Sequence, residues 1–381
     1  MLSGFVVLSQ NNQLVVEGTI IDESGLTIPY AAVSVQGKTV GTTSTDEGTF
    51  NLILTKEHES DSLVISSMGY ETKKIKIDEY LILEDFNIVL VEIVTTLDEA
   101  KVMYAKDFVE EAINRLKENT ISETHLLNIL YRRASIEDYK AKFLVEHYMK
   151  ILDKGPSAST FKKLEVVEAR KSADYRILKR KQIMHAINYM IDHNPLRDKN
   201  SLKNYSWERI GESSYDGEEI VIVEGRNEKS NFVKLYIGLD TYKVYRINTS
   251  FSNALFVYQK NAEGKLYLNY HSREWNKPKK RALEPSTIRA LGKNAPTSVL
   301  VAYRQEVYVL GLETDKDMFD IKPRESHDID MGDLVIEYNP EFWKNISLPP
   351  DTEFFKKIKL ELTEIFGVPL EQQFQYVNNS K

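Results

Sequence analysis

The chain has 381 residues, of which 42% are apolar and 28% charged, the composition of a folded soluble protein of two or three domains. Its 50 basic and 57 acidic residues give a net charge of -7, which argues against a dedicated nucleic-acid-binding protein because neutralising phosphates needs a basic surface. The absence of cysteine excludes disulfides, thiolate metal sites and cysteine nucleophiles.

The first ten residues have the character of a secretory signal. An apolar run from Leu2 to Leu8 precedes a polar stretch, and the small residues Val7 and Ser9 stand where a signal peptidase cuts. We therefore expect export, with a mature chain that begins near Gln10. The alternative is an ordinary first strand, because the run is short and no basic region precedes it. No other stretch approaches the ~20 apolar residues of a membrane-spanning helix.

Short strands follow one another from residue 14 to residue 93. Apolar and polar residues alternate between Val15 and Ile21, the pattern of a strand with one buried face. Turn signals stand at Asp22–Gly25 and at Asp46–Gly48. Further strands are expected at residues 31–36, 49–54, 62–67 and 72–77. Several short strands with no helical pattern between them predict a small β-sandwich.

The same residues resemble a known family. The strings VVEGTIIDESGLTIPYAAVSVQGKTVGTTSTDEGTFNLIL and LVISSMGYET are similar to the carboxypeptidase-regulatory-like domain found in many envelope proteins of Bacteroidetes. The matching positions are Gly18, Asp22, Gly25, Pro29, Ala31, Val33, Val35, Gly37, Gly41, Thr42, Thr45, Asp46, Gly48, Phe50, Ser67, Gly69 and Tyr70. The resemblance implies a seven-stranded, transthyretin-like sandwich that precedes another module and is not itself a peptidase.

A helical connector is expected over residues 94–200. Apolar residues between Ala105 and Leu116 recur at helical spacing, with charged residues on the opposite face, and a second helical stretch is predicted from Ile177 to Ile191. The strings YAKDFVEEAINRLKENT, LLNILYRRAS, KFLVEHYMKILDKG and, near the end, YNPEFWKNISLPP resemble a family of Bacteroidetes proteins in which a second module follows the sandwich. That resemblance implies no established activity.

Longer strands are predicted between Tyr205 and Glu313, with turns at Asp216–Gly217 and Gly238–Asp240. The spacing of these strands and turns resembles the antiparallel half-barrel of LolA-type lipoprotein-carrier folds. That resemblance implies a curved sheet that wraps helices and can enclose an apolar ligand. A final helix is expected from Asp351 or Thr352 to Phe366, ended by Gly367 and Pro369.

The predicted fold class is therefore mostly β with helices (β + α/β). A probable signal remnant covers residues 1–10, the sandwich residues 14–93, the helical connector and the start of the second module residues 94–200, and the curved antiparallel sheet with its C-terminal helix residues 201–381. The helices at 351–366 and 177–191 are the candidates to fill the inward apolar face of that sheet. We expect a filled core rather than an open cavity, because aromatic residues are abundant.

A catalytic zinc site is the first enzymatic hypothesis to test. His271 and Glu274 form an H-x-x-E pair of the kind that metallocarboxypeptidases use. Residues three apart on a strand point to opposite faces, so this pair cannot chelate one ion, and the surrounding strands differ from the α/β domain of such enzymes. We therefore expect no catalytic metal.

The other polar clusters are better explained as solvated surface than as metal-binding sites. The sequence HDIDMGD holds His327, Asp328, Asp330 and Asp333, but it lacks the ligand number of a calcium loop and contains a turn. His185 and His193 lie eight residues apart, too far for chelation on one helix face, with Asp192 beside the second.

Nucleophile and phosphate motifs are missing as well. Gly264–Lys265 and Gly292–Lys293 lack the upstream glycine of a phosphate loop, and no G-x-S-x-G sequence exists. The basic run Lys277, Lys279, Lys280, Arg281 follows Trp275 and could meet an anionic group. A solvated hairpin tip is the favoured interpretation, because the run is short and the net charge is acidic.

These observations predict a non-catalytic accessory protein of the cell envelope. It would act as an interaction or assembly subunit at the periplasmic side of the outer membrane, with envelope or outer-membrane proteins as partners, because an open sheet edge pairs with other chains. One alternative is a periplasmic carrier that binds a lipid or lipoprotein by its acyl chain. A second is a hydrolase built from scattered carboxylates. No catalytic residue, cofactor-binding residue or metal ligand is assigned.

Overall fold

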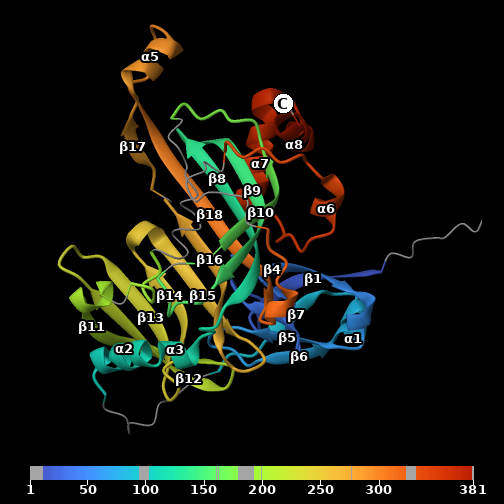
Figure 1. Ribbon diagram of the computed structural model, residues 1–381, viewed down its shortest axis with the longest axis vertical. Coiled ribbons are helices and arrows are strands. Elements are labelled where there is room, and N and C mark those ends of the chain that lie inside the picture. The colour runs from blue at the N-terminus through green and yellow to red at the C-terminus, as the bar shows by residue number, and fades with distance from the viewer. Residues whose placement is uncertain are drawn as a thin grey trace, which may run out of the picture.

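A computed structural model describes residues 12–93, 103–159, 161, 163–178, 193–198, 200–275, 277–322 and 332–379. The protein is mostly β, with a small N-terminal sandwich beside a large curved sheet (Figure 1). The signal predicted at residues 1–10 lies outside the described residues, as do residues 179–191 of the helix that we expected there.

Seven strands form the sandwich, as predicted. A three-stranded sheet of order β4-β1-β7 packs on a four-stranded sheet of order β3-β2-β5-β6. The strands are β1 (Gln13–Asp22), β2 (Ala32–Val35), β3 (Gly41–Thr43), β4 (Thr49–Thr55), β5 (Ser62–Ser66), β6 (Lys73–Lys76) and β7 (Asn87–Leu90); α1 (Ile77–Leu81) follows β6 and η1 (Lys56–His58) follows β4.

The sandwich has a core of its own. Val16 from one sheet and Val33 from the other are fully buried, and every side chain of this core lies between residues 14 and 90. Gly48 closes the turn after β3 with φ +75°, and a Cβ there would lie 2.7 Å from the carbonyl oxygen of Ile20. The predicted glycine turn is therefore required by the close approach of β1.

The large sheet has eleven strands and is antiparallel, curved and not closed, which confirms the predicted fold class. Its order is β10-β9-β8-β18-β16-β15-β14-β13-β12-β11, and β17 pairs with β18 beyond the end of β16. The strands are β8 (His125–Glu137), β9 (Lys140–Asp153), β10 (Lys163–Lys171), β11 (Ser206–Tyr215), β12 (Glu218–Arg226), β13 (Phe232–Gly238), β14 (Val244–Thr249), β15 (Ala254–Lys260), β16 (Leu266–Glu274), β17 (Lys279–Ala282) and β18 (Ser298–Glu313).

The helical connector predicted at residues 94–200 is wrong for most of its length. Only α2 (Ala105–Asn114) and α3 (Leu116–Asn119) are helical among its described residues, and β8, β9 and β10 follow them. These strands are buried on both faces, so their apolar residues run on without the alternation of a half-exposed strand. Such runs cannot be separated from buried helices by periodicity.

Helices cover both faces of the large sheet. On β8, Leu127 and Ile129 share a core with α2, whereas Leu130 shares a second core with α7, because successive strand residues point to opposite faces. The helix expected at 351–366 thus packs on the face opposite to α2. Further helices are α5 (Pro285–Leu291), α6 (Pro340–Lys344), α7 (Glu353–Phe366), α8 (Leu370–Asn379), η2 (Ser201–Asn204), η3 (Phe251–Asn253) and η4 (Lys316–Met318).

Both ends of α7 follow the sequence prediction. The Thr352 hydroxyl accepts a hydrogen bond from the backbone N–H of Phe355, so Thr352 is the N-cap. Gly367 ends the helix in the left-handed conformation with φ 63°.

The sandwich contacts the large sheet through polar groups. Asn269 of β16 donates a hydrogen bond to the Thr43 hydroxyl at 2.5 Å, and the Ser66 hydroxyl lies 3.2 Å from the Tyr215 hydroxyl. The backbone N–H of Gly69 donates to the carbonyl of Ser214 at 2.7 Å. Because these groups are directional, they fix the orientation of the sandwich on the sheet.

Candidate functional site

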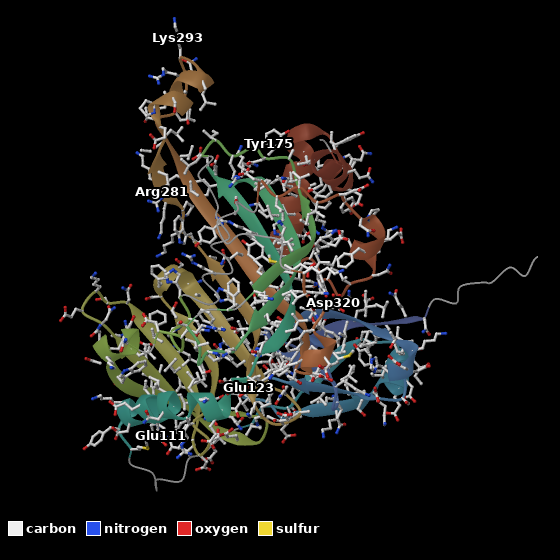
Figure 2. The ribbon with its side chains drawn as sticks, viewed as in Figure 1. Glu111, Glu123, Tyr175, Arg281, Lys293 and Asp320 are labelled. Atoms are coloured by element: carbon white, nitrogen blue, oxygen red, sulfur yellow. The ribbon has the colours of Figure 1, made fainter. Side chains whose placement is uncertain are left out.

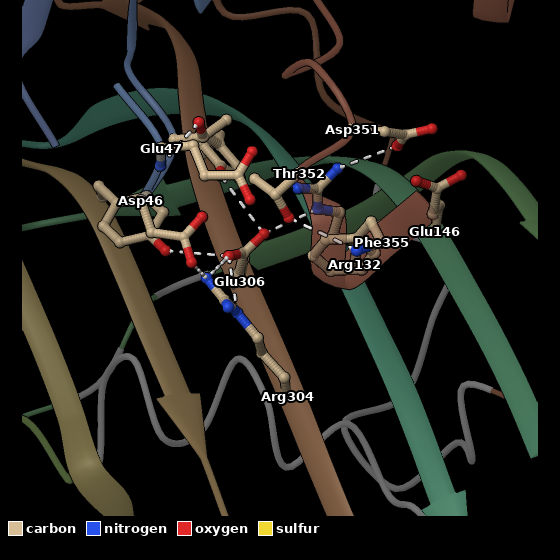
Figure 3. A network of polar contacts seen from close by, with 12 residues as sticks. Asp46, Glu47, Arg132, Glu146, Arg304, Glu306, Asp351, Thr352 and Phe355 are labelled. Atoms are coloured by element: carbon tan, nitrogen blue, oxygen red, sulfur yellow. Dashed lines mark hydrogen bonds and ion pairs between the residues drawn. The ribbon is translucent and has the colours of Figure 1, made fainter. Parts of the chain in front are cut away.

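A buried network of charges joins the sandwich, the large sheet and α7 (Figure 3). We call it the charged junction, and it consists of Asp46 and Glu47 from the turn before β4, Arg132 from β8, Arg304 and Glu306 from β18, and the start of α7 at Asp351–Glu353. Its members come from the beginning, the middle and the end of the chain. The junction is therefore a point at which all three parts of the fold are held together.

Glu306 is the centre of the charged junction. Its side chain is 1% exposed and accepts hydrogen bonds from Arg132 Nε at 2.7 Å and from Arg304 Nη2 at 2.7 Å. The Arg304 guanidinium also donates to Asp46 of the sandwich at 2.8 Å. Glu47 accepts from the backbone N–H of Glu353 at 2.8 Å, so a carboxylate lies at the N-terminus of α7, where the helix dipole favours it.

Strand register explains why these side chains meet. Arg132 of β8 lies directly opposite Glu306 of β18, and residues directly opposite on neighbouring strands interact most closely. Arg304 precedes Glu306 by two residues and therefore projects from the same face. Tyr30 of the sandwich stacks on Tyr270 of β16 with ring centroids 4.9 Å apart, which covers the junction with aromatic rings.

The electrostatics of the charged junction keep the Glu306 carboxylate ionised. Burial alone would raise the pKa of Glu306, but Arg132 and Arg304 outweigh it and hold the pKa below its usual value. A second buried pair behaves in the same way, because Arg170 donates to Glu146 at 2.6 Å and lowers its pKa against the effect of burial. A carboxylate that two guanidinium groups neutralise is a poor base, so we assign the junction a structural role.

The H-x-x-E pair lies on opposite faces of β16. His271 is fully buried, stacks on Phe256 with ring centroids 4.3 Å apart, and lies 2.8 Å by Nδ1 from the carbonyl of Leu255. Burial lowers the pKa of His271 to about 3, so the ring is neutral and Nδ1 carries its proton. Glu274 accepts from Asn253 at 2.8 Å instead. The pair is not brought together.

The other candidates from the sequence are dispersed. Within the described ranges no group of three or more histidine and acidic side chains is placed to hold a metal ion. Asp333 is exposed, while His327, Asp328, Asp330 and His185 lie outside the described residues. His193 lies beside Phe251, with ring centroids 5.5 Å apart. No helix in the described part of the chain is both long and apolar enough to span a membrane.

A cleft of about 640 Å³ opens between α2 and the start of β11. We call it the α2 cleft, and its apolar walls are Val109, Ile113, Leu202, Tyr205 and Trp207. Lys106, Glu110 and Lys203 also line it and are exposed, and Lys106 pairs with Glu110 at 3.2 Å, so the rim carries charges of both signs. An apolar hollow with a few charged groups at its edge is the usual form of a small-molecule site.

A glycine shapes one wall of the α2 cleft. Trp207 of β11 lies flat on Gly225, its register partner on β12, and a Cβ at Gly225 would lie 2.9 Å from the indole ring. Tyr205 stands beside Trp207, with ring centroids 5.9 Å apart. The aromatic wall is therefore preformed, because no side chain on β12 competes for the space under the indole.

Neither the charged junction nor the α2 cleft was predicted from the sequence. A usable signal existed for the junction, since Arg304 and Glu306 alternate inside an apolar strand, where charges are retained only when they are paired. The cleft depends on the register that places Gly225 under Trp207, which the sequence does not reveal.

The sandwich has the sequence signature of a known domain. Residues 16–102 match the model of the CarboxypepD_reg-like domain, which confirms the resemblance found in the first quarter of the chain. Among curated proteins, none matches this chain significantly.

Several solved structures resemble part of this chain only loosely. A LolA superfamily protein from Nitrosomonas europaea is 14% identical over 56% of this chain and 95% of its own, with a TM-score of 0.25. A putative outer membrane lipoprotein-sorting protein domain from Vibrio parahaemolyticus is 7% identical over 57% and 95%, with a TM-score of 0.29. MucB in its complex with MucA from Pseudomonas aeruginosa is 9% identical over 54% and 99%, with a TM-score of 0.20.

Proposed function

We propose that this protein is a non-catalytic binding protein of the cell envelope that holds the acyl chain of a lipid or lipoprotein in the α2 cleft. The observation that supports it is the cleft itself, whose volume of about 640 Å³ falls within the range of pockets that bury small ligands. We also propose an envelope location, on the periplasmic side of the outer membrane, which the resemblance of the sandwich to a domain of envelope proteins supports.

The chemistry of the α2 cleft suits an amphiphile. Ile113, Tyr205 and Trp207 are only partly buried and would cover methylene groups of a ligand. Asn114 and Asn200 also line the cleft, so part of its wall is polar. An acyl chain in the cleft would remove these apolar walls from water. Lys203 at the rim suits an anionic head group, whereas Lys106 is already paired with Glu110.

The interaction or assembly subunit is the second candidate, and the charged junction favours it. The junction fixes Asp46 and Glu47 of the sandwich to β18 and α7, so sandwich and sheet present one rigid surface to a partner. A pull-down from detergent-solubilised envelopes, with mass spectrometry of both lipids and proteins, separates the two candidates. Bound lipid supports the carrier, and protein partners without lipid support the subunit.

Substitution of Gly225 tests the α2 cleft directly. In Gly225→Ala the new methyl group would push the Trp207 ring into the cleft, whereas Gly211→Ala on the same pair of strands meets only the Ile222 methyl group at 3.7 Å and is the control. We expect Gly225→Ala to lose a fluorescent fatty-acid probe that the parent chain and the control bind, and to lose lipid in native mass spectra. Equal probe binding by all three proteins would rule out the cleft as the ligand site.

A further inference from the structure

Residues 277–297 form an arm that projects from the large sheet. The arm comprises β17, α5 and the loop that returns to β18, and its only strand pairing is that of β17 with residues 298–301 of β18. Figure 1 shows α5 extended beyond the end of the sheet, and Figure 2 places Lys293 at its tip and Arg281 nearer its base. The arm is therefore a convex extension that few other parts of the protein contact.

Positive charge is concentrated on this arm, although the whole chain carries a net charge of -7. Glu284 is the arm's single acidic residue. Its six basic residues are Lys277, Lys279, Lys280, Arg281, Arg289 and Lys293. All except the half-buried Arg281 are exposed, and none forms an ion pair with a described carboxylate. These charges are thus available to an anionic surface.

An aromatic platform holds two of these cations in place. Lys279 Nζ lies 4.1 Å from the centre of the Trp275 ring, and the Arg281 guanidinium lies 5.2 Å from it. The Trp275 indole N–H donates to the Ser252 hydroxyl at 3.1 Å, so the ring itself is fixed. Cations ordered in this way lose less conformational entropy when they bind.

The tip of the arm is apolar as well as basic. None of the α5 residues is buried, and Leu291 is 48% exposed. Ile288 and Ala290 are further apolar residues on this helix, and Gly292 ends it with φ +94°. A short helix that combines unpartnered apolar and basic side chains matches the composition of segments that lie in the interface of a membrane.

We propose that the arm docks the protein on the surface of an anionic phospholipid bilayer. The six basic side chains would contact phosphate head groups, and Ile288 and Leu291 would enter the boundary between head groups and acyl chains. The tip favours a bilayer over an acidic protein, because an acidic surface would pair with the basic side chains alone, whereas a bilayer also accepts the exposed Leu291. Docking is independent of the α2 cleft, because α2 and α5 lie at opposite ends of the large sheet in Figure 1.

Vesicle flotation with the full chain tests the proposal. The vesicles are pure phosphatidylcholine, or phosphatidylcholine with about one third phosphatidylglycerol. We expect binding only to the anionic vesicles, and weaker binding as salt rises. The triple variant Lys277→Gln/Lys280→Gln/Lys293→Gln should bind about a hundredfold more weakly, at about fivefold for each basic residue. Leu291→Ser should also bind more weakly, with an unchanged salt dependence.

Matched controls come from the sandwich. Lys38, Lys56 and Lys74 are exposed lysines whose combined change to glutamine should leave vesicle binding unchanged, as should Leu26→Ser at a leucine that is 69% exposed. Far-ultraviolet circular dichroism and thermal melting confirm that each variant is folded, because the sandwich contains no tryptophan.

Three results with vesicles would overturn the proposal: no binding to anionic vesicles, equal binding to neutral vesicles, or undiminished binding of the triple variant. Capture of an acidic protein through the arm, without vesicle binding, would assign the arm to that class of partner instead and also overturn it. Gly225→Ala should still float with the vesicles, so failure of the cleft and failure of the arm can be told apart.

Discussion

Replacement of Glu306 by glutamine should destabilise the protein severely. Arg132 and Glu306 are 2% and 1% exposed, and loss of one partner from a buried ion pair costs about 3–5 kcal/mol because the other charge remains buried. Arg132 would keep Asp351 at 4.0 Å and the Phe355 ring at 3.6 Å, and Arg304 would keep Asp46. We therefore expect the lower end, about 3 kcal/mol, or roughly a hundredfold in the folding equilibrium.

Urea unfolding monitored by tryptophan fluorescence measures this cost in the right part of the chain, since Trp207, Trp275 and Trp343 all lie outside the sandwich. Arg132→Met and the double variant with Glu306→Gln complete a double-mutant cycle. The double variant should cost about 1–3 kcal/mol less than the sum of the single variants, because no unpaired guanidinium remains at position 132. Two results would refute the structural role of the charged junction. One is a cost below about 1 kcal/mol for Glu306→Gln, and the other is a double-variant cost that equals the sum of the single-variant costs within about 0.5 kcal/mol.

The effect of Glu306→Gln should also depend on pH. The pKa of Glu306 is lower in the folded protein than in an ordinary glutamate, so the stabilisation is present at neutral pH and is lost as pH falls through the folded-state pKa. The difference in unfolding free energy between the parent chain and Glu306→Gln should therefore narrow in acid. A constant difference across that range would mean that Glu306 is not ionised in the folded state.

Further predictions concern other parts of the fold. The pKa of His271 is about 3 in the folded chain and takes its ordinary value of 6.5 in the unfolded chain. Because the unfolded chain alone binds this proton between pH 6.5 and pH 5, the free energy of unfolding should fall by about 2 kcal/mol over that range. Urea titrations of His271→Asn should lack this loss. Thr352→Ala should cost about 1 kcal/mol by removal of the α7 cap, and an unchanged melting temperature would contradict this. Residues 12–93 alone should unfold cooperatively, because the sandwich core is self-contained; a protease-sensitive fragment would contradict it. Elemental analysis should find no stoichiometric transition metal that His271→Ala removes.

Local signals in the sequence were sufficient for the sandwich and for α7. These signals depend on residues that are close in sequence, so they can be recognised without the structure. Examples are the glycine turn at Gly48, and the N-cap Thr352 and C-terminal Gly367 of α7. The strands β8 to β10 were missed because burial on both faces removes the alternation. The charged junction was missed because Asp46 and Arg304 meet only through tertiary structure.

The position of β18 in the chain has a consequence for folding. This strand supplies the partner of β8, β16 and β17, yet it is the last strand among the residues that the structure describes, and its Val301 pairs with Glu137 of β8. Pairing of such distant segments is slow because a long loop must close first. During synthesis the sandwich can fold early, whereas β8, β9 and β10 emerge with an open edge that only the final strand covers. We expect chains halted before β18 to bind holdase chaperones, and completed chains to be released from them.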